Sequence, residues 1–208
     1  MLVVLRAVAD LAVTGPSLRV RIPRADDAAA LYRHASDPEV TRWFSWGPYL
    51  SEDEARAYLA RLPAQRDRGE QLDLVVEHLQ AGPIGICGLS ELSPRDRRAS
   101  IGTWLARDWW GTGANHECKA LMCHVAFALL GLERVGAYAN VDHTRSQRAL
   151  ERLGFEREGV LRRFHRHHGR SLDVAVFSLL RQDWLAGPLR EVPLTVRGAA
   201  PQTFVVTF

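Results

Sequence analysis

The sequence is poor in cysteine and contains no long apolar run. Its three cysteines, Cys87, Cys118 and Cys123, are odd in number and lack the spacing of a metal site, so we expect reduced thiols instead of a disulfide framework. No apolar run approaches the roughly 20 residues that a membrane helix needs. The apolar start of the chain is interrupted by Arg6 before a signal-peptide core can form. These absences favour a cytoplasmic protein over a secreted disulfide scaffold or a membrane-spanning protein.

Charge of one sign is equally scarce. The 27 lysine and arginine residues and the 24 aspartate and glutamate residues leave a net charge of only +3 in a chain of 208 residues. The excess arginines are spread along the chain and form no basic run with interleaved aromatics, so we expect a mixed solvated surface and no nucleic-acid partner. A hydrophobic fraction of 47% and a charged fraction of 25% are typical of a soluble globular protein. We therefore expect one folded domain, with or without an appendage.

Hydrophobic periodicity alternates between strand and helix along the chain. Strands are expected at residues 18–22, 72–78, 84–92, 99–105 and 135–141, and a hairpin at residues 160–165 and 173–180. Helices are expected near residues 28–35, 52–62, 115–130 and 146–153. This order predicts a mixed α/β domain.

A glycine-containing turn joins one of these strand patterns to a helical pattern. Its residues are Trp110, Gly111, Thr112, Gly113, Ala114 and Asn115. The two glycines permit positive φ, so that successive backbone N–H groups can face one point, and the following helix adds its unpaired amides and its dipole. Such a turn binds anions, phosphate above all. Two glycines alone also fit a tight connection that has no ligand.

A second segment, residues 142–161, extends this motif to a family resemblance. It contains Ser146, then Leu150-Glu-Arg-Leu-Gly-Phe155 and Glu158-Gly-Val-Leu161. Together with the glycine turn, these motifs resemble the GNAT N-acetyltransferase superfamily over residues 18–184, in particular its ribosomal-protein N-acetyltransferase (RimJ/RimL-like) branch. The resemblance implies an α/β (α+β) GNAT fold: a twisted, mostly antiparallel sheet with a central splay, flanked by helices.

The resemblance also implies a division of the chain. Residues 1–17 would form an N-terminal extension, residues 18–184 the acetyltransferase domain, and residues 185–208 a C-terminal extension. The C-terminal extension is either a tail or an added strand within the fold or with a second subunit, because its last residues, Thr203 to Phe208, are rich in β-forming side chains. We expect a monomer or a homodimer.

The function implied by the resemblance is transfer of an acetyl group from acetyl-CoA to a primary amine. The acceptor is either a protein N-terminus or the amine of a small molecule, such as an antibiotic or a biosynthetic intermediate. Three departures from the family pattern, at Asn115, His143 and Leu150, leave open a catalytically weak acyl-CoA-binding regulatory module. A GNAT enzyme with a different acyl donor is the remaining alternative.

The same resemblance assigns residues to the donor. The turn from Trp110 to Asn115 would hold the pyrophosphate, and the strand end at Trp104 and Leu105 would pair with the pantetheine amides. His143 stands where this branch carries an asparagine that bonds to pantetheine, and an imidazole can donate one such hydrogen bond.

Two residues are candidates for proton transfer. Glu91 matches a glutamate that accepts the proton of the attacking ammonium, although a carboxylate at a strand end can equally be a plain surface residue. Ser146 matches a serine that assists the leaving thiolate, and a serine at a helix start is also a good cap. A tyrosine acid, common in the family, is replaced by Leu150.

The acceptor side is expected to contain aromatic and histidine side chains. Trp43, Trp46 and Tyr49 lie in one loop and form either core packing or a wall of the acceptor groove. His165 belongs to a group of three histidines near the expected hairpin turn. We favour solvated residues at the acceptor mouth over a metal site, because ligand spacing is lacking.

Overall fold

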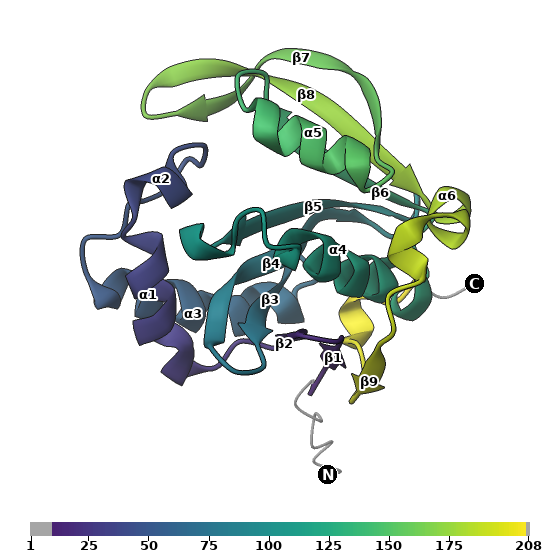
Figure 1. Cartoon of the computed structure of the whole chain (residues 1–208), viewed down its shortest axis with the longest axis horizontal. Helices are drawn as coiled ribbons and strands as arrows, with labels where there is room; N and C mark the ends of the chain where they lie inside the picture. Colours follow the sequence, from purple (N-terminus) through teal and green to yellow (C-terminus); the bar gives the residue numbers. More distant parts are fainter. Residues whose placement is uncertain (1–9, 207–208) are drawn as a thin grey trace.

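The structure, a computed structural model, describes residues 10–206 as one nine-stranded sheet with helices on both faces (Figure 1). The strand order is β7-β8-β6-β5-β4-β3-β2-β1-β9. The strands are β1 (Ala12–Thr14), β2 (Leu18–Arg21), β3 (Gln71–His78), β4 (Gly82–Ser93), β5 (Arg98–Leu105), β6 (Arg134–Asn140), β7 (Glu156–His167), β8 (Arg170–Leu180) and β9 (Thr195–Arg197). Neighbouring strands in the described part are antiparallel, except β5 and β6.

The helices divide between the two faces of the sheet. They are α1 (Ala28–Ala35), α2 (Pro38–Thr41), α3 (Glu52–Asp67), α4 (Ala114–His124), α5 (Thr144–Arg152) and α6 (Arg181–Ala186). Alternation along β3 shows the two faces, because Leu74 belongs to the large core beneath α4 whereas Val75 belongs to the smaller core beneath α1 and α3. In the part of the chain that is described, no helix is both long and apolar enough to cross a membrane.

The centre of the sheet is splayed, as expected. β5 and β6 pair in parallel only over their first residues, Arg98–Ser100 opposite Arg134–Gly136. Beyond this point β5 pairs only with β4, as far as Leu105, and β6 pairs only with β8, as far as Asn140. The facing edges of residues 101–105 and 137–140 therefore offer backbone groups that no strand of the described chain satisfies.

The outer edge of the sheet differs from the sequence expectation. The added strand is β9, which pairs with β1 in antiparallel register, whereas residues 202–204 form a 3-10 turn instead of a strand. Phe204 is buried in the core, and the Val206 N–H donates to the Leu130 carbonyl at 2.9 Å, so burial and one long-range bond determine this segment. Residues 1–9 of the expected N-terminal extension and residues 207–208 lie outside the described residues. The boundaries proposed at residues 18 and 184 stay a prediction.

α3 is longer than its periodicity indicates. It continues from Leu62, the last residue expected, through Pro63 to Asp67. A proline inside a helix lacks the N–H of one helical bond. The extension is contacted by the C-terminal segment, whose Thr203 hydroxyl donates to the Arg66 carbonyl at 3.0 Å. A local pattern that ends at a proline cannot detect this distant contact.

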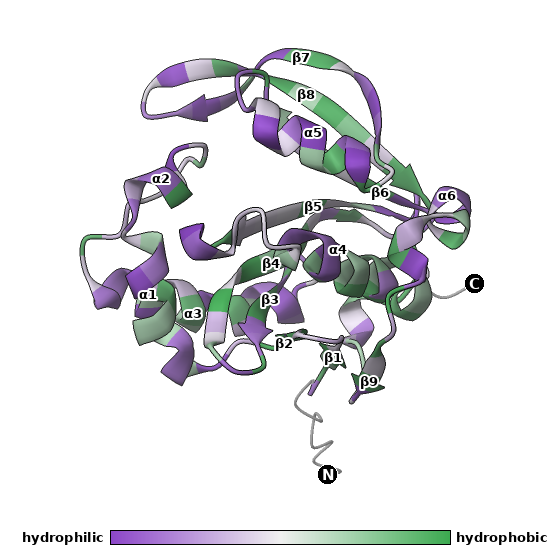
Figure 2. Cartoon of the chain, in the orientation of Figure 1, coloured by the Kyte–Doolittle hydropathy of each residue, from purple (hydrophilic) through white to green (hydrophobic). Residues whose placement is uncertain are grey.

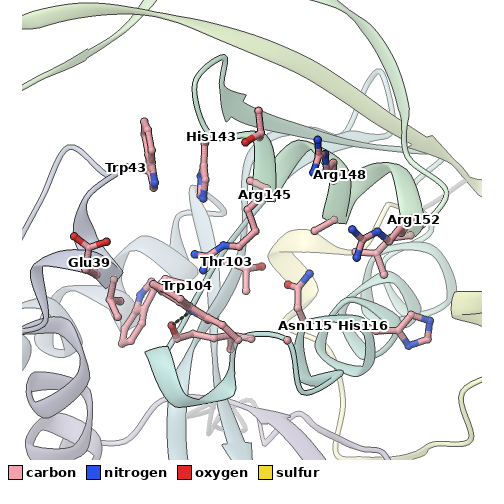
Figure 3. Close-up of a pocket in the computed structure, with 18 of the residues that line it drawn as sticks. Glu39, Trp43, Thr103, Trp104, Asn115, His116, His143, Arg145, Arg148 and Arg152 are labelled. Atoms are coloured by element: carbon pink, nitrogen blue, oxygen red, sulfur yellow. Dashed lines mark hydrogen bonds between the residues drawn. The ribbon is translucent and has the colours of Figure 1, made fainter.

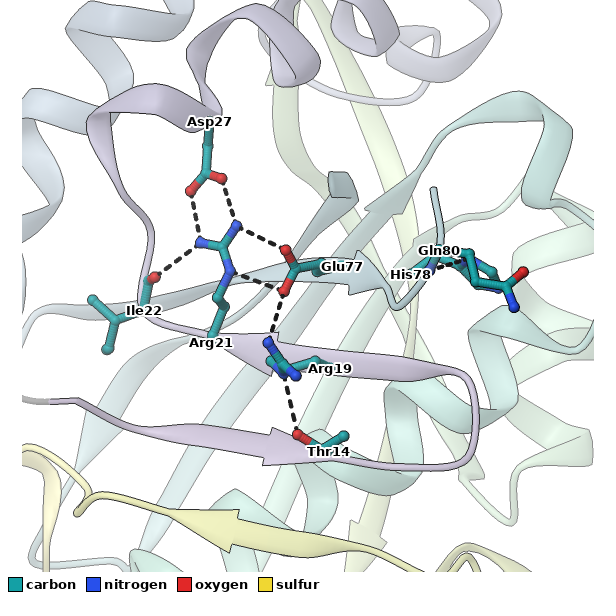
Figure 4. A network of polar contacts seen from close by, with 8 residues as sticks. All are labelled: Thr14, Arg19, Arg21, Ile22, Asp27, Glu77, His78 and Gln80. Atoms are coloured by element: carbon teal, nitrogen blue, oxygen red, sulfur yellow. Dashed lines mark hydrogen bonds and ion pairs between the residues drawn. The ribbon is translucent and has the colours of Figure 1, made fainter. Parts of the chain in front are cut away.

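A buried ion network fixes the entrance to α1 (Figure 4). Arg21 of β2 donates from Nη1 and Nη2 to the two carboxylate oxygens of Asp27, at 2.9 and 2.6 Å, and from Nε to Glu77 at 3.1 Å. Arg21 and Asp27 are 6% and 3% exposed. Each buried charge thus meets an opposite charge, which offsets the cost of removing it from water.

The three cysteines are buried and form no disulfide bond with one another.

Candidate active site

A cavity of about 640 Å³ opens where β5 and β6 separate. Its walls come from residues 39–44, from the end of β5 at residues 103–105, from residues 110–116 and from residues 143–153 of α5 and its flanks (Figure 3). The cavity therefore adjoins the unpaired edge of β5 and the first turn of α4.

The glycine turn gives this cavity an exposed stretch of backbone. Gly111 and Gly113 have φ values of +79° and +94°, a conformation that strongly favours glycine. Gly113 directly precedes α4, where the Ala114 and His116 N–H groups are bonded within the turn. The N–H groups of Gly111, Thr112, Gly113 and Asn115, in contrast, have no hydrogen-bond partner among the described residues. A Cβ built on either glycine meets no atom within 4 Å, so the space in front of the turn is open. The turn can thus accept an anion against its backbone.

The six residues of the turn divide between two hollows. Trp110, Gly111, Gly113 and Asn115 line the cavity. The Thr112 hydroxyl instead donates to the Trp109 carbonyl at 2.9 Å and accepts from the Ala114 N–H at 3.3 Å. Thr112 and Ala114 line a separate hollow of about 440 Å³, which Gly113 also borders.

α5 presents a basic face to the cavity (Figure 3). Arg145, Arg148 and Arg152 line it, and positions three and four residues apart share one helical face. The Arg145 guanidinium carbon lies 3.7 Å from the ring centroid of Trp110, a cation–π contact. Figure 2 shows α5 as largely hydrophilic. Sequence reasoning missed these arginines, although their spacing within an expected helix was the available signal.

His143 and Trp43 form a stacked pair at the cavity. Their ring centroids are 4.7 Å apart and their planes differ by 12°. Burial, together with the nearby charges of Arg145 and Arg42, lowers the pKa of His143 to about 4, so the imidazole is neutral at pH 7. Its buried Nε2 has no hydrogen-bond partner among the described residues. A ligand in the cavity can supply that partner.

The other aromatic residues of the loop lie around β5. The rings of Trp46 and Trp104 meet edge to face, with centroids 5.9 Å apart, and Tyr49 packs against Trp46 at 5.3 Å. Trp104 and Tyr49 both pack against the smaller core, beneath α1 and α3. Trp104 and Leu105 line the cavity, and the Leu105 carbonyl accepts from the indole N–H of Trp110 at 2.9 Å. This bond ties the end of β5 to the glycine turn.

Comparison with known proteins identifies the family of this fold. The acetyltransferase (GNAT) domain family matches residues 17–156. The chain belongs to the GNAT acetyltransferase family. It is 31% identical over 169 residues to the uncharacterized N-acetyltransferase p20 of Bacillus licheniformis, an alignment that covers 80% of this chain and 94% of the relative. The resemblance to the GNAT superfamily is confirmed, and the protein is an N-acetyltransferase of this type.

Solved structures share the fold. A GCN5-related N-acetyltransferase from Brucella melitensis matches with a TM-score of 0.76 and 23% identity, covering 88% of this chain and 86% of that one. The microcin C7 self-immunity acetyltransferase MccE, in complex with acetyl-CoA and AMP, matches with a TM-score of 0.71 and 19% identity, covering 79% of this chain and 92% of that one. The expected GNAT fold is confirmed.

In this GNAT acetyltransferase the two candidates for proton transfer lie in different surroundings. Ser146 lines the cavity, whereas Glu91 does not. Glu91 sits in a β-bulge with φ at +53°, and its Oε2 accepts hydrogen bonds from the Ser100 hydroxyl at 2.6 Å and the Tyr138 hydroxyl at 3.1 Å. These bonds link β4, β5 and β6 at the point where the pairing of β5 and β6 ends. A strained backbone that directs a carboxylate to this point is a reason to consider a functional role.

His165 belongs to the same side of the GNAT sheet as Glu91. Its ring lies edge-on to Tyr138, with centroids 5.7 Å apart, and Phe164 packs against both rings. Glu91, Tyr138 and His165 thus form a cluster that the hairpin of β7 and β8 partly covers. Among the described residues, no group of three or more histidine, cysteine or acidic side chains is arranged to hold a metal ion.

Proposed function

We propose that this enzyme transfers an acetyl group from acetyl-CoA to a primary amine and that the 640 Å³ cavity holds the donor. The observation that carries the proposal is the open glycine turn at the start of α4, which faces the arginines of α5 beside the splay. Coenzyme A is a polyanion with a pyrophosphate, and an open helix N-terminus with nearby arginines suits such a group. The fold shared with MccE, whose structure contains acetyl-CoA, supports the same donor.

Different residues of this chain would bind different parts of acetyl-CoA. The free N–H groups of the glycine turn and of Asn115 would bind the pyrophosphate, and the arginines of α5 would neutralise the remaining phosphate charge. The open edges near Leu105 and Tyr138 would pair with the pantetheine amides as an extra strand does. The unpartnered Nε2 of His143 would bond to the same arm of the donor.

For the chemical step, the bound thioester supplies an acyl carbon that a neutral amine can attack. A primary amine is mostly protonated at pH 7, so its proton must first be removed. Glu91 would accept that proton, directly or through water, while Ser100 and Tyr138 hold its carboxylate in position. Ser146 would donate to the departing thiolate, and a backbone N–H on the open edge of β5 would bond to the carbonyl oxygen as charge develops there.

The acceptor is a primary amine of one of two classes, a protein N-terminus or a small molecule. A protein N-terminus follows from the RimJ/RimL-like resemblance. A small-molecule amine fits equally well, because loops and helices that vary widely among GNAT enzymes build the acceptor side.

Calorimetry with acetyl-CoA and a matched pair of glycine variants tests the donor site. Gly113→Val adds a branched side chain where the backbone must approach phosphate, and we expect the affinity to fall by roughly tenfold or more. Gly169→Val is the control, because Gly169 also has a positive φ and an open Cβ position but lies in the turn between β7 and β8. Equal affinities in the two folded variants would refute the site. Release of free thiol in the presence of amines then tests the transfer itself.

A further inference from the structure

The sheet face beneath α1 and α3 contains a shallow trough that leads to the splay. β3, β4 and β5 bring Asp73, Gly88 and Gly102 into one row across the sheet. The rows on either side carry side chains, Val75, Ile86 and Trp104 on one side and Gln71, Ser90 and Ser100 on the other. Because the middle row has two neighbouring glycines, the sheet surface is lower there than in the flanking rows.

Asp73 forms the end of this trough. It is 8% exposed, and its Oδ2 accepts hydrogen bonds from the Tyr58 hydroxyl and from the Gln71 amide at 2.7 Å. Its Oδ1 lies only 1.8 Å from the place where a Cβ of Gly88 would stand. The carboxylate therefore leans over β4 toward β5, and only a glycine at position 88 leaves room for it.

The charge of Asp73 is not balanced within the described structure. No lysine or arginine of residues 10–206 lies within ion-pair distance of it, and its Oδ1 accepts no hydrogen bond there. The pKa of Asp73 is raised above its ordinary value, because burial outweighs the opposing hydrogen bonds from Tyr58 and Gln71. Asp27, which is 3% exposed, accepts hydrogen bonds from Arg21 with both carboxylate oxygens (Figure 4). A buried carboxylate without a cation is costly, so it takes up a proton more readily and gains strongly from a ligand that supplies the positive charge.

The open end of the trough lies at Gly102. This residue is exposed, and a Cβ built on it meets no atom within 4 Å. Its neighbours on the same face of β5 are Ser100, which bonds to Glu91, and Trp104, which lines the donor cavity. The Tyr58 ring lies beside the carboxylate, and Trp104 borders the open end of the trough in the neighbouring row, so aromatic rings that suit an organic cation stand at both ends.

We propose that Asp73 binds a second positively charged nitrogen of the acceptor, which is therefore a compound with two basic nitrogens. This inference rests on the proposed acetyl transfer, in which Glu91 receives the proton of the reacting amine. The rows of Ser100 and Gly102 are roughly 7 Å apart along β5, and Asp73 lies two strands away on β3, roughly 10 Å across the sheet. The backbone positions of Asp73 and Ser100 are therefore about 12 Å apart, and the Asp73 carboxylate shortens this gap because it leans over β4. An alkyl diamine whose nitrogens each bond to one carboxylate bridges such a gap, and so does an N-terminal amine followed by a basic side chain.

Matched acceptors with one and two basic nitrogens test the proposal. For the full-length wild type we expect the diamine 1,5-diaminopentane to have a KM roughly ten- to a hundredfold lower than the monoamine 1-aminopentane, as for a hydrogen bond to a charged group. Asp73→Asn keeps the shape and both neighbouring bonds, and should abolish this preference while kcat changes by less than about twofold. Asp53→Asn removes an exposed carboxylate from α3 and should leave the preference intact.

The variant Gly102→Val tests the same site if Asp73→Asn fails to fold. Gly102→Val fills the open end of the trough, changes no charge, and suits a strand. It should reduce the preference for the diamine in the same way. Two peptides that begin Ala-Lys and Ala-norleucine distinguish a protein acceptor from a small molecule. A preference for the second basic nitrogen that occurs only with the peptides assigns a protein acceptor. A preference that occurs only with the amines assigns a small molecule.

Three results would overturn the role of Asp73. These are equal KM values for the paired acceptors in the wild type, an unchanged preference in Asp73→Asn, and an equal fall in kcat for both acceptors in that variant. Calorimetric titration of the wild type and of Asp73→Asn with the diamine measures the same role without turnover. Tighter diamine binding that requires Asp73, without thiol release from acetyl-CoA, would refute the proposed transfer alone.

Discussion

The donor cavity and the sheet face beneath α1 and α3 meet along β5, yet the charged residues to which we assign ligand contacts differ in sign between them. The cavity contains three arginines, and Glu39 is the one carboxylate among the described residues that line it. The opposite face contains Glu91 and Asp73. Because side chains alternate along a strand, one strand can border both environments. The difference shows how a small domain can attract a polyanionic donor and a cationic acceptor without directing either to the site of the other.

Removal of the proposed catalytic carboxylate on the acceptor side should have the largest effect on activity. Glu91→Gln keeps the bonds from Ser100 and Tyr138 but cannot accept a proton, so kcat should fall by roughly 10²- to 10⁴-fold. The KM for acetyl-CoA should stay unchanged, and activity should recover as pH rises, because less of the amine is then protonated. Steady-state rates over the titration range of the amine measure this. Ser100→Ala removes only one of the two bonds to the Glu91 carboxylate and should lower kcat less. If Glu91→Gln keeps the pH–rate profile of the wild type, Glu91 is not the base.

A carboxylate that already has its cation should behave differently. Asp27→Asn breaks the pair with buried Arg21, and the free energy of unfolding should fall by roughly 3 kcal/mol, the lower part of the range for a broken buried pair, since Glu77 still neutralises the guanidinium. Urea denaturation measures the change. The preference between the paired acceptors should persist at a temperature where the variant is folded. A loss of that preference with unchanged stability would reverse the roles that we give to Asp27 and Asp73.

The arginines of α5 should matter less individually. Arg148 and Arg152 are exposed, so each is expected to contribute only about 0.2–1 kcal/mol to binding of the donor. Replacement of both by alanine should weaken acetyl-CoA binding by roughly 2- to 30-fold and reduce its dependence on salt. Calorimetry at two ionic strengths measures both effects. Arg157 and Arg162, which are also exposed but belong to β7, provide the control pair, and equal losses in the two double variants would argue against a donor site at α5.

The smallest expected effect concerns His143. Its folded pKa of about 4 lies below its ordinary value of 6.5, so the unfolded state binds a proton more readily. The wild type should therefore lose stability as the pH falls from 6.5 toward 4, and His143→Asn should lose less over that interval. Thermal unfolding of both proteins at a series of pH values measures the difference. Parallel curves would show that burial and the nearby arginines do not hold the imidazole neutral.

The donor side could be predicted from the sequence more fully than the acceptor side, for a physical reason. A strand, two glycines and a helix are adjacent in the chain, and their local geometry determines where the backbone N–H groups face. The row that contains Asp73 depends instead on the register of three strands, and 29 residues separate Asp73 from Gly102 in the chain. The direction of Glu91 depends on a bulge and a positive φ that a glutamate rarely adopts.

The edge strand β9 also could not be located from the local sequence. The sequence indicated an added strand near the C-terminus, yet β-propensity alone favoured residues 203–208 over residues 195–197. The pairing partner of β9 is β1, at the opposite end of the chain. Phe204 has a strand-like side chain but is held in a 3-10 turn because its ring is buried in the core. Long-range burial thus outweighed the local preference.

The short pairing between β5 and β6 also has a thermodynamic consequence. Three residue pairs join one half of the sheet, from β9 to β5, to the other half, from β6 to β8. A donor that bonds to both open edges would add a ladder between these halves, so its binding energy would appear as resistance to unfolding, about 2.7 kcal/mol at a concentration one hundred times its Kd. Amide hydrogen exchange at residues 101–105 and 137–140 should then slow most on saturation, because the donor would add backbone bonds between two halves that otherwise share a hydrophobic core and three residue pairs.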